Sequence, residues 1–145
     1  MHDDDLDYTS GVAAFTAKHF SRAMQLLSPL AAAGNADAQH RVAIMLQNGL
    51  GVVANLEAAH RWMRAAAEQG HALAQHGMGF MYLEGEGVAQ DGAEAARWFR
   101  LAAEQGLAGS QTTLAMMYEE GRGVAQDLDE ARRWYRAAGF EEKAE

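Results

Sequence analysis

The chain has 145 residues, no cysteine, and 12 Lys and Arg against 20 Asp and Glu, which gives a net charge of −8. The length allows one domain or a short repeat array, and the lack of cysteine excludes disulfides, thiolate metal ligands and cysteine nucleophiles. The acidic balance argues against a nucleic-acid partner, because such partners are bound through neutralised phosphates. No apolar run reaches the roughly 18 residues that span a bilayer, and the acidic N-terminus is unlike a secretory signal. We therefore expect a cytoplasmic location and no membrane insertion.

The first residues predict a tail and then a shortened helical hairpin. Residues 1–7 are rich in aspartate and are expected to form an acidic disordered tail. Residues 8–35 predict a shortened N-terminal hairpin of the tetratricopeptide type, with helices over 8–18 and 20–33 and no glycine loop between them. Pro29 lies inside the second helix, where it should kink or locally break the helix.

From residue 36 onward the chain repeats itself every 36 residues. Trp62, Trp98 and Trp134 recur at this interval, and more than half of the positions in the second and third copies are identical. Self-similarity at a fixed period of this length indicates a repeat architecture. The predicted repeats are 36–71, 72–107 and 108–139, followed by a C-terminal tail at 140–145.

Each repeat predicts two helices separated by a glycine turn. In the second repeat, the first helix ends at Gly85, because glycine enters the left-handed region at low cost. Asp91 then begins the second helix as an N-cap, and Glu94 is placed to complete a capping box. The equivalent caps are Asn55 and Asp127. The prediction is an all-α fold, a right-handed α-solenoid of about three and a half stacked antiparallel helical hairpins.

The repeat resembles that of the Sel1-like repeat family, α-solenoid relatives of the tetratricopeptide repeats. In the second repeat the matching residues are Ala72, Ala74, Gln75, Met78, Gly79, Tyr82, Gly85, Gly87, Val88, Asp91, Glu94, Ala95, Trp98, Ala102, Ala103 and Gly106. The resemblance implies a non-enzymatic adaptor that binds a protein or peptide partner, in bacterial signalling, envelope assembly, secretion or neutralisation of an effector. These residues build the scaffold, so they do not identify the partner.

Sequence patterns for catalysis and metal binding are weak. Ser110 lacks a nucleophile-elbow motif and is expected to cap a helix. His71 and His76 are five residues apart, which places them on different faces of a helix. His40 and His76 fall on successive hairpins, about 8–10 Å apart, too far to share one ion. We therefore expect no catalytic residue, no metal site and no cofactor.

Positions that vary between repeats are the one indication of a binding surface. The first helix of each repeat presents three such positions on one face, and the expected partner-binding residues are His40, Ile44, Gln47, His76, Phe80, Leu83, Thr112, Met116 and Glu119. First helices line the concave side of such solenoids, so an apolar ridge at positions 44, 80 and 116 would suit a bound peptide. The alternative is that these three residues are core residues packed between helices.

Two other functions stay open. A small-molecule-binding protein or an enzyme would use a pocket that includes His40 and His76. An assembly subunit would instead self-associate end to end and weakly, through the C-terminal helix. No further helix is predicted after the third repeat, so Trp134, Tyr135 and Phe140 would be partly exposed.

Overall fold

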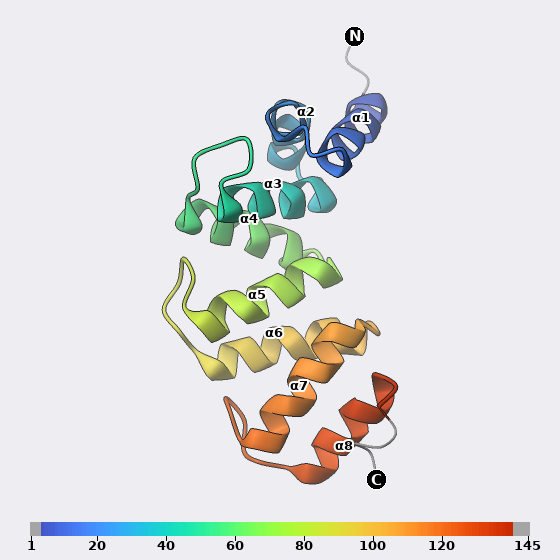
Figure 1. Ribbon diagram of the computed structural model, residues 1–145, viewed down its shortest axis with the longest axis vertical. Helices are drawn as coiled ribbons and strands as arrows, with labels where there is room; N and C mark the ends of the chain where they lie inside the picture. The colour runs from blue at the N-terminus through green and yellow to red at the C-terminus, as the bar shows by residue number, and fades with distance from the viewer. Residues whose placement is uncertain (1–3, 141–145) are drawn as a thin grey trace. The chain divides into compact units, whose positions relative to one another are not determined.

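The computed structural model describes residues 4–140, which contain eight α-helices and no strand (Figure 1). Consecutive helices pair as four hairpins, α1 with α2, α3 with α4, α5 with α6 and α7 with α8. The all-α prediction is confirmed. The helices are α1 (Asp4–Thr16), α2 (Phe20–Ala32), α3 (Ala36–Asn48), α4 (Leu56–Glu68), α5 (Ala72–Glu84), α6 (Gly92–Glu104), α7 (Ala108–Glu120) and α8 (Leu128–Ala137).

The chain divides into two compact units, unit 1 at residues 1–71 and unit 2 at residues 72–145. Unit 1 contains α1 to α4, and its two hairpins stack through α2 and α3. Unit 2 contains α5 to α8, and its two hairpins stack through α6 and α7. In both units, the second helix of the first hairpin packs against the first helix of the second hairpin.

The N-terminal hairpin differs from its prediction. Helix α1 begins at Asp4, so residues 4–7 are helical and do not belong to a tail, whereas residues 1–3 lie outside the described part. Aspartates at positions 4, 5 and 7 occupy the first turn, where negative charge is stabilised by the helix dipole. Both α1 and α2 have 13 residues, the same length as α3 to α7. Only the connection between them is short.

Helix α2 is not broken by Pro29, because it continues to Ala32. A proline at this position removes one backbone hydrogen bond and normally costs the helix several kcal/mol. The neighbouring Leu27, Leu30 and Ala31 are buried. Tertiary packing of this apolar face therefore holds the helix together past the proline.

The predicted N-caps are present in all three glycine-turn repeats. Asn55, Asp91 and Asp127 each accept a hydrogen bond from a backbone N–H in the first turn of the helix that follows. In the second repeat, the two groups that a capping box would join also have other partners. The Asp91 N–H donates to the Tyr82 carbonyl at 2.9 Å, while the Glu94 carboxylate pairs with Arg97 at 2.8 Å. The backbone bond from Asp91 therefore closes the glycine turn back onto the preceding helix.

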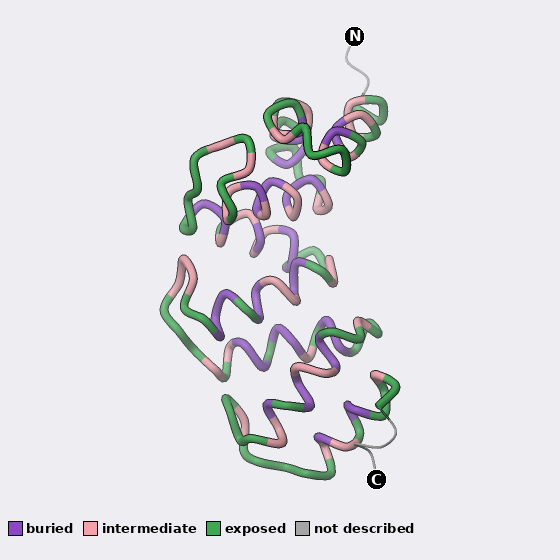
Figure 2. The backbone as a smooth tube through the Cα atoms, viewed as in Figure 1, coloured by how far each residue is buried: buried purple, intermediate pink, exposed green. Residues whose placement is uncertain are grey.

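The core lies on the faces that the helices turn toward one another (Figure 2). In unit 2, Phe99 is fully buried, and its ring lies 2.6 Å from where a Cβ on Gly79 would be. Glycine is thus required at position 79 because any side chain there would clash with an aromatic ring. The large side chains that are fully buried are Leu27, Met45 and Met63 in unit 1 and Met78, Met81, Phe99 and Leu114 in unit 2.

A recurring glutamine ties neighbouring helices together. Gln39 donates from Nε2 to the Ala31 carbonyl at 3.1 Å, and Gln111 donates to the Ala103 carbonyl at 3.1 Å. Both side chains are buried, where an unsatisfied amide would be costly. The repeated glutamines are therefore part of the scaffold.

Across residues 4–140, no helix has both the length and the apolar character needed to cross a membrane.

Candidate functional site

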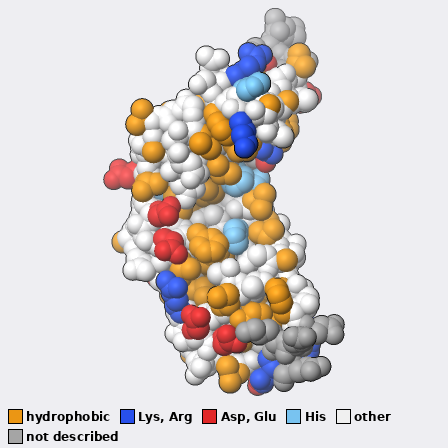
Figure 3. Space-filling view, viewed as in Figure 1, with side chains coloured by type: hydrophobic (Ala, Val, Ile, Leu, Met, Phe, Trp, Pro, Cys, Tyr) orange, Lys and Arg blue, Asp and Glu red, His pale blue; other side chains and the backbone are white. Residues whose placement is uncertain are grey.

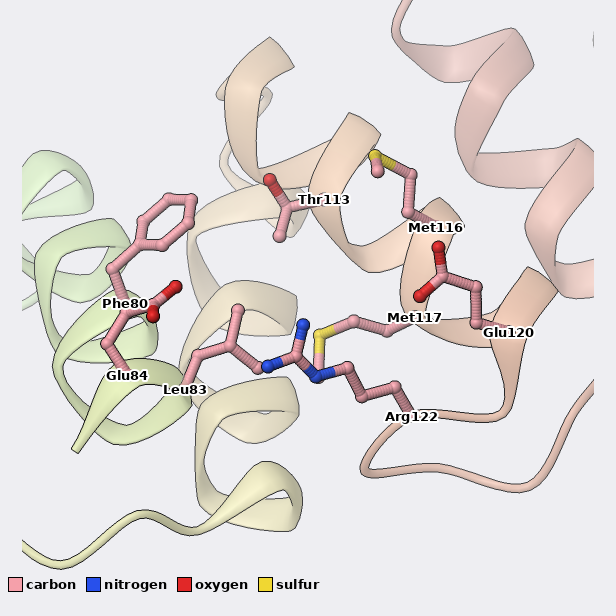
Figure 4. Close-up of a pocket in the computed structure, with 8 residues that line it drawn as sticks. All are labelled: Phe80, Leu83, Glu84, Thr113, Met116, Met117, Glu120 and Arg122. Atoms are coloured by element: carbon pink, nitrogen blue, oxygen red, sulfur yellow. The ribbon is translucent and has the colours of Figure 1, made fainter.

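A surface cavity of about 280 Å³ lies in unit 2 and is lined by residues of α5, α7 and the turn after α7 (Figure 4). We call it the α5–α7 groove. Its lining residues are Phe80, Leu83, Glu84, Thr113, Met116, Met117, Glu120 and Arg122.

The apolar part of the groove combines exposed and buried side chains. Phe80 from α5 is 38% exposed and Met116 from α7 is 45% exposed. Leu83 and Met117 are buried and line the same cavity. Large apolar side chains left open within a concave site are the usual contacts for a partner's apolar side chain. Phe80 and Met116 are therefore exposed side chains and not core residues packed between helices.

The other lining residues are mostly charged. Glu84 ends α5, Glu120 ends α7, and Arg122 lies in the glycine turn that follows. Figure 3 shows hydrophobic side chains of unit 2 lying beside acidic ones on the face in view. Two carboxylates against one guanidinium leave the charged lining of the groove net negative.

Phe80 is held by an aromatic cluster. Its ring meets Phe99 edge-on with centroids 4.9 Å apart, and His76 meets it edge-on at 5.0 Å. His76 Nδ1 is also 2.6 Å from Ser110 Oγ. Burial lowers the pKa of His76 below its ordinary value, so the ring is neutral at pH 7 and acts as a hydrogen-bonding and packing group.

Ser110 does not cap α7. The N-cap position is Leu107, and Ser110 lies in the first turn of the helix, fully buried, with its hydroxyl against His76. A fully buried hydroxyl cannot reach a substrate, so this serine–histidine pair does not have the geometry of a nucleophile and its base. The pair instead fixes the position of the imidazole.

Unit 2 contains six of the expected partner-binding residues, and three of them line the groove. These are Phe80, Leu83 and Met116. His76 does not line the groove but packs against the ring of Phe80, as described above. Thr112 donates to the Ala108 carbonyl at 3.0 Å, and Glu119 accepts a hydrogen bond from the Tyr135 hydroxyl at 3.3 Å.

Sequence reasoning missed the charged residues of the groove. Glu84 and Glu120 occupy the same position in successive repeats, and a recurring residue is readily taken as part of the scaffold. Arg122 corresponds to Glu86 in the preceding repeat. Variation at this turn position is a signal that could have found it.

The three expected residues of unit 1 are less exposed than Phe80 and Met116. His40, Ile44 and Gln47 are all half-buried. The ring of His40 lies against that of His71, with centroids 4.7 Å apart. Burial, together with the nearby charge of His71, lowers the pKa of His40 to about 4.

His71 belongs to a polar cluster at the start of α3. It precedes α5 and does not share a helix face with His76, because Gly70 at a φ of +92° turns the chain back toward α3. Its Nε2 lies 3.3 Å from Asp37 Oδ1. The hydrogen bond from His71, together with those from Arg41 and Tyr8, holds the pKa of Asp37 well below its usual range. Sequence spacing could not show that Asp37, His40 and His71 meet.

The C-terminal aromatic residues are less open than expected. Trp134 is 7% exposed and Tyr135 is 4% exposed, so both are core residues of the last hairpin. Phe140 is 49% exposed and meets Tyr135 edge-on at 6.2 Å. Residues 141–145, which complete the expected C-terminal tail, lie outside the described part.

The stacked hairpins define the class of this protein, a helical-repeat protein of the α-solenoid type. The Sel1 repeat model matches residues 36–71, 72–107 and 108–139, and the chain belongs to the Sel1 repeat family. Proteins of this family typically mediate protein–protein interaction.

Two solved structures are similar over nearly the whole chain. A Sel1 repeat protein from Oxalobacter formigenes is 37% identical, with a TM-score of 0.86 over 90% of this chain and 54% of its own. A protective antigen with an SLR fold, present in uropathogenic Escherichia coli strains, is 32% identical, with a TM-score of 0.88 over 93% of this chain and 30% of its own. This chain therefore spans about half and about a third of their lengths. No curated protein gives a significant match.

Proposed function

We propose that this chain is a non-enzymatic interaction module that binds a peptide segment of a partner protein in the α5–α7 groove. The observation that carries the proposal is the exposure of Phe80 and Met116 within one cavity, at positions that differ between repeats. Burying two such side chains against a partner stabilises a complex by roughly 25 cal/mol for each Å² of apolar surface removed from water.

The chemistry of the groove favours a particular kind of peptide. An apolar side chain would occupy the space between Phe80 and Met116, and a nearby Lys or Arg would pair with Glu84 or Glu120. Exposed pairs add little affinity, but they select the partner and its orientation. The proposed ligand is therefore a segment with an apolar anchor flanked by basic residues.

The competing functions have less support. An enzyme would need an accessible nucleophile or acid–base pair, whereas Ser110 is buried and His76 is enclosed by aromatic rings. End-to-end self-association was expected to use Trp134, Tyr135 and Phe140; the first two are buried, and Phe140 is 49% exposed. A small-molecule site was expected to include His40 and His76, and neither residue lines the groove.

A peptide-display selection on the folded full chain tests the proposal. We expect enriched peptides to contain an apolar residue with a neighbouring Lys or Arg, and Phe80→Ala or Met116→Ala to weaken their binding at least about tenfold, a loss typical of an interface anchor. Leu73→Ala is the matched control, because Leu73 is exposed on α5 but does not line the groove. Thermal unfolding of each variant shows that it is folded. Unchanged binding by both groove variants would contradict the proposal.

A further inference from the structure

We propose that Asp37, His40 and His71 form a binding site for a divalent transition-metal ion of the Zn²⁺ type. One ligand atom from each of the three residues lies within 4.8 Å of the other two. Two imidazoles and one carboxylate are a donor set that suits Zn²⁺ and its first-row neighbours. This site lies in unit 1 and is independent of the groove in unit 2.

The distances are close to those that a bound ion requires. Metal–ligand bonds of about 2.0–2.1 Å in a tetrahedral site place the ligand atoms ~3.3–3.4 Å apart. Asp37 Oδ1 and His71 Nε2 are already 3.3 Å apart. An ion would replace the hydrogen bond between them, and His40 would complete the set after a side-chain shift on the order of 1 Å.

The local backbone presents these residues together. Asp37 and His40 lie in the first part of α3 at a spacing of i, i+3, so they share one face of that helix. His71 reaches the same face from the connection between α4 and α5, after the turn at Gly70. An ion at this point would join two segments that are far apart in the sequence.

The carboxylate is held in a ligating orientation by its other oxygen. Asp37 Oδ2 accepts hydrogen bonds from the Tyr8 hydroxyl at 2.7 Å and from Arg41 Nε at 2.8 Å, which leaves Oδ1 directed at His71. Outer partners of this kind orient a ligand and contribute to metal affinity. Tyr8 comes from α1, so the support is built from the tertiary structure and not from α3 alone.

Arg41 opposes a cation through its charge. Its guanidinium lies over the Phe15 ring at 4.9 Å, and this contact with α1 and the hydrogen bond to Asp37 occupy its charged group. With one carboxylate and one guanidinium near the ion, the proposed site should bind more weakly than a site without the nearby positive charge. Three protein ligands also leave a coordination position for water.

Unit 2 provides an internal control. The positions equivalent to Asp37, His40 and His71 are Leu73, His76 and Leu107. Only the histidine is retained, and it contacts Ser110 and aromatic rings. The proposal therefore predicts one metal ion per chain, bound in unit 1.

Calorimetric titration of Zn²⁺ into the full chain tests the site. We expect saturable binding of one ion, a rise in the melting temperature with Zn²⁺, and at least a tenfold loss of affinity in His71→Ala and His40→Ala. His76→Ala and His2→Ala are the controls and should bind as the parent chain does. No saturable binding, or an affinity equal to that of the parent chain in both unit 1 variants, overturns the proposal.

Spectroscopy with Co²⁺ gives a second readout that does not depend on stability. Tetrahedral nitrogen and oxygen ligands give Co²⁺ visible absorption bands, and the ion shifts the NMR signals of the imidazoles that bind it. We expect the signals of His40 and His71 to shift and that of His76 to stay. Asp37→Asn should weaken the absorption, with circular dichroism confirming that the variant is folded. A shift confined to other histidines contradicts the site.

Discussion

The two units share a scaffold and differ in what surrounds the same histidine. His40 in unit 1 and His76 in unit 2 occupy one repeat position. His40 lies against His71 in the cluster around Asp37, whereas His76 lies against Phe80, Phe99 and Ser110. One residue type thus belongs to a polar cluster in one unit and to an aromatic cluster in the other. Its role is set by its neighbours and not by the repeat pattern.

The apolar position four residues later shows the same contrast. Ile44 is half-buried in unit 1, while Phe80 and Met116 are exposed and line a cavity in unit 2. The backbone is alike in the two units, with helices of 13 residues except for the shorter α8, and with the same buried glutamines. We therefore expect the two units to differ in function at positions where their side chains differ. At positions where the side chains recur, we expect substitutions to have equal effects on stability. Four predictions test this division.

Removing Phe99 should have the largest effect. Phe99→Ala empties a fully buried site beneath Phe80 and His76, and we expect a loss of about 3–5 kcal/mol in the free energy of unfolding of unit 2. Urea unfolding followed by hydrogen exchange in each unit measures the change. Phe80→Ala is the control and should cost much less, because that ring is 38% exposed. Equal losses would show that Phe80 is a core residue.

Removing the Asp37 carboxylate should destabilise unit 1 by about 1–3 kcal/mol, because three donors lose their acceptor. These donors are Tyr8, Arg41 and His71. Asp37→Ala is compared by thermal unfolding with Leu73→Ala, a change at the equivalent exposed position of unit 2, which should stay within about 0.5 kcal/mol. A similar effect at both positions would contradict the contrast between the units.

Scaffold caps should behave alike in the two units. Asn55 and Asp127 hold equivalent positions and make equivalent hydrogen bonds, so Asn55→Ala and Asp127→Ala should each cost about 1 kcal/mol. Chemical unfolding curves of the single variants give the comparison. A loss of stability in only one of the two variants would show that equivalent caps do not contribute equally to the free energy of unfolding.

At pH 7 the smallest effect on stability concerns proton binding. The pKa of His40 is lowered to about 4, below the ordinary value of about 6.5. Because the unfolded chain binds this proton first, stability should fall as the pH falls from about 6.5 to 4; this loss is absent above that range and complete below it. NMR titration of the imidazole signals, with a chelator present, should place His40 near 4. Stability of His40→Asn should depend less on pH over this range. Titration of His40 at an ordinary value would contradict its burial.

The fold was largely predictable from the sequence because repeats make the pattern visible several times. The helix-ending glycines and the caps at Asn55, Asp91 and Asp127 follow from backbone conformation and local hydrogen bonding. The errors came where distant packing decided the outcome. Buried neighbours carry α2 through Pro29, and Ser110 is drawn into a contact with His76 instead of capping its helix.

The site was predictable in part. Variation between repeats drew attention to Phe80, Leu83 and Met116, and the structure places these three residues in the lining of one cavity. It could not find Glu84 or Glu120, because these residues recur and their exposure is not visible in a repeat pattern. It also could not find the cluster of Asp37 and His71, which are 34 residues apart and belong to different structural segments.

The sequence alone determined the all-α fold, the hairpin repeat, the glycine turns and the N-caps that begin the second helix of each repeat. These features depend on local conformational preference and on the period of apolar residues, both of which can be read along the chain. Only the tertiary structure decided which histidine meets a carboxylate, which meets a phenylalanine, and which variable residues remain open to a partner. Such contacts form between side chains that are distant in sequence, and no local rule fixes the distance between them.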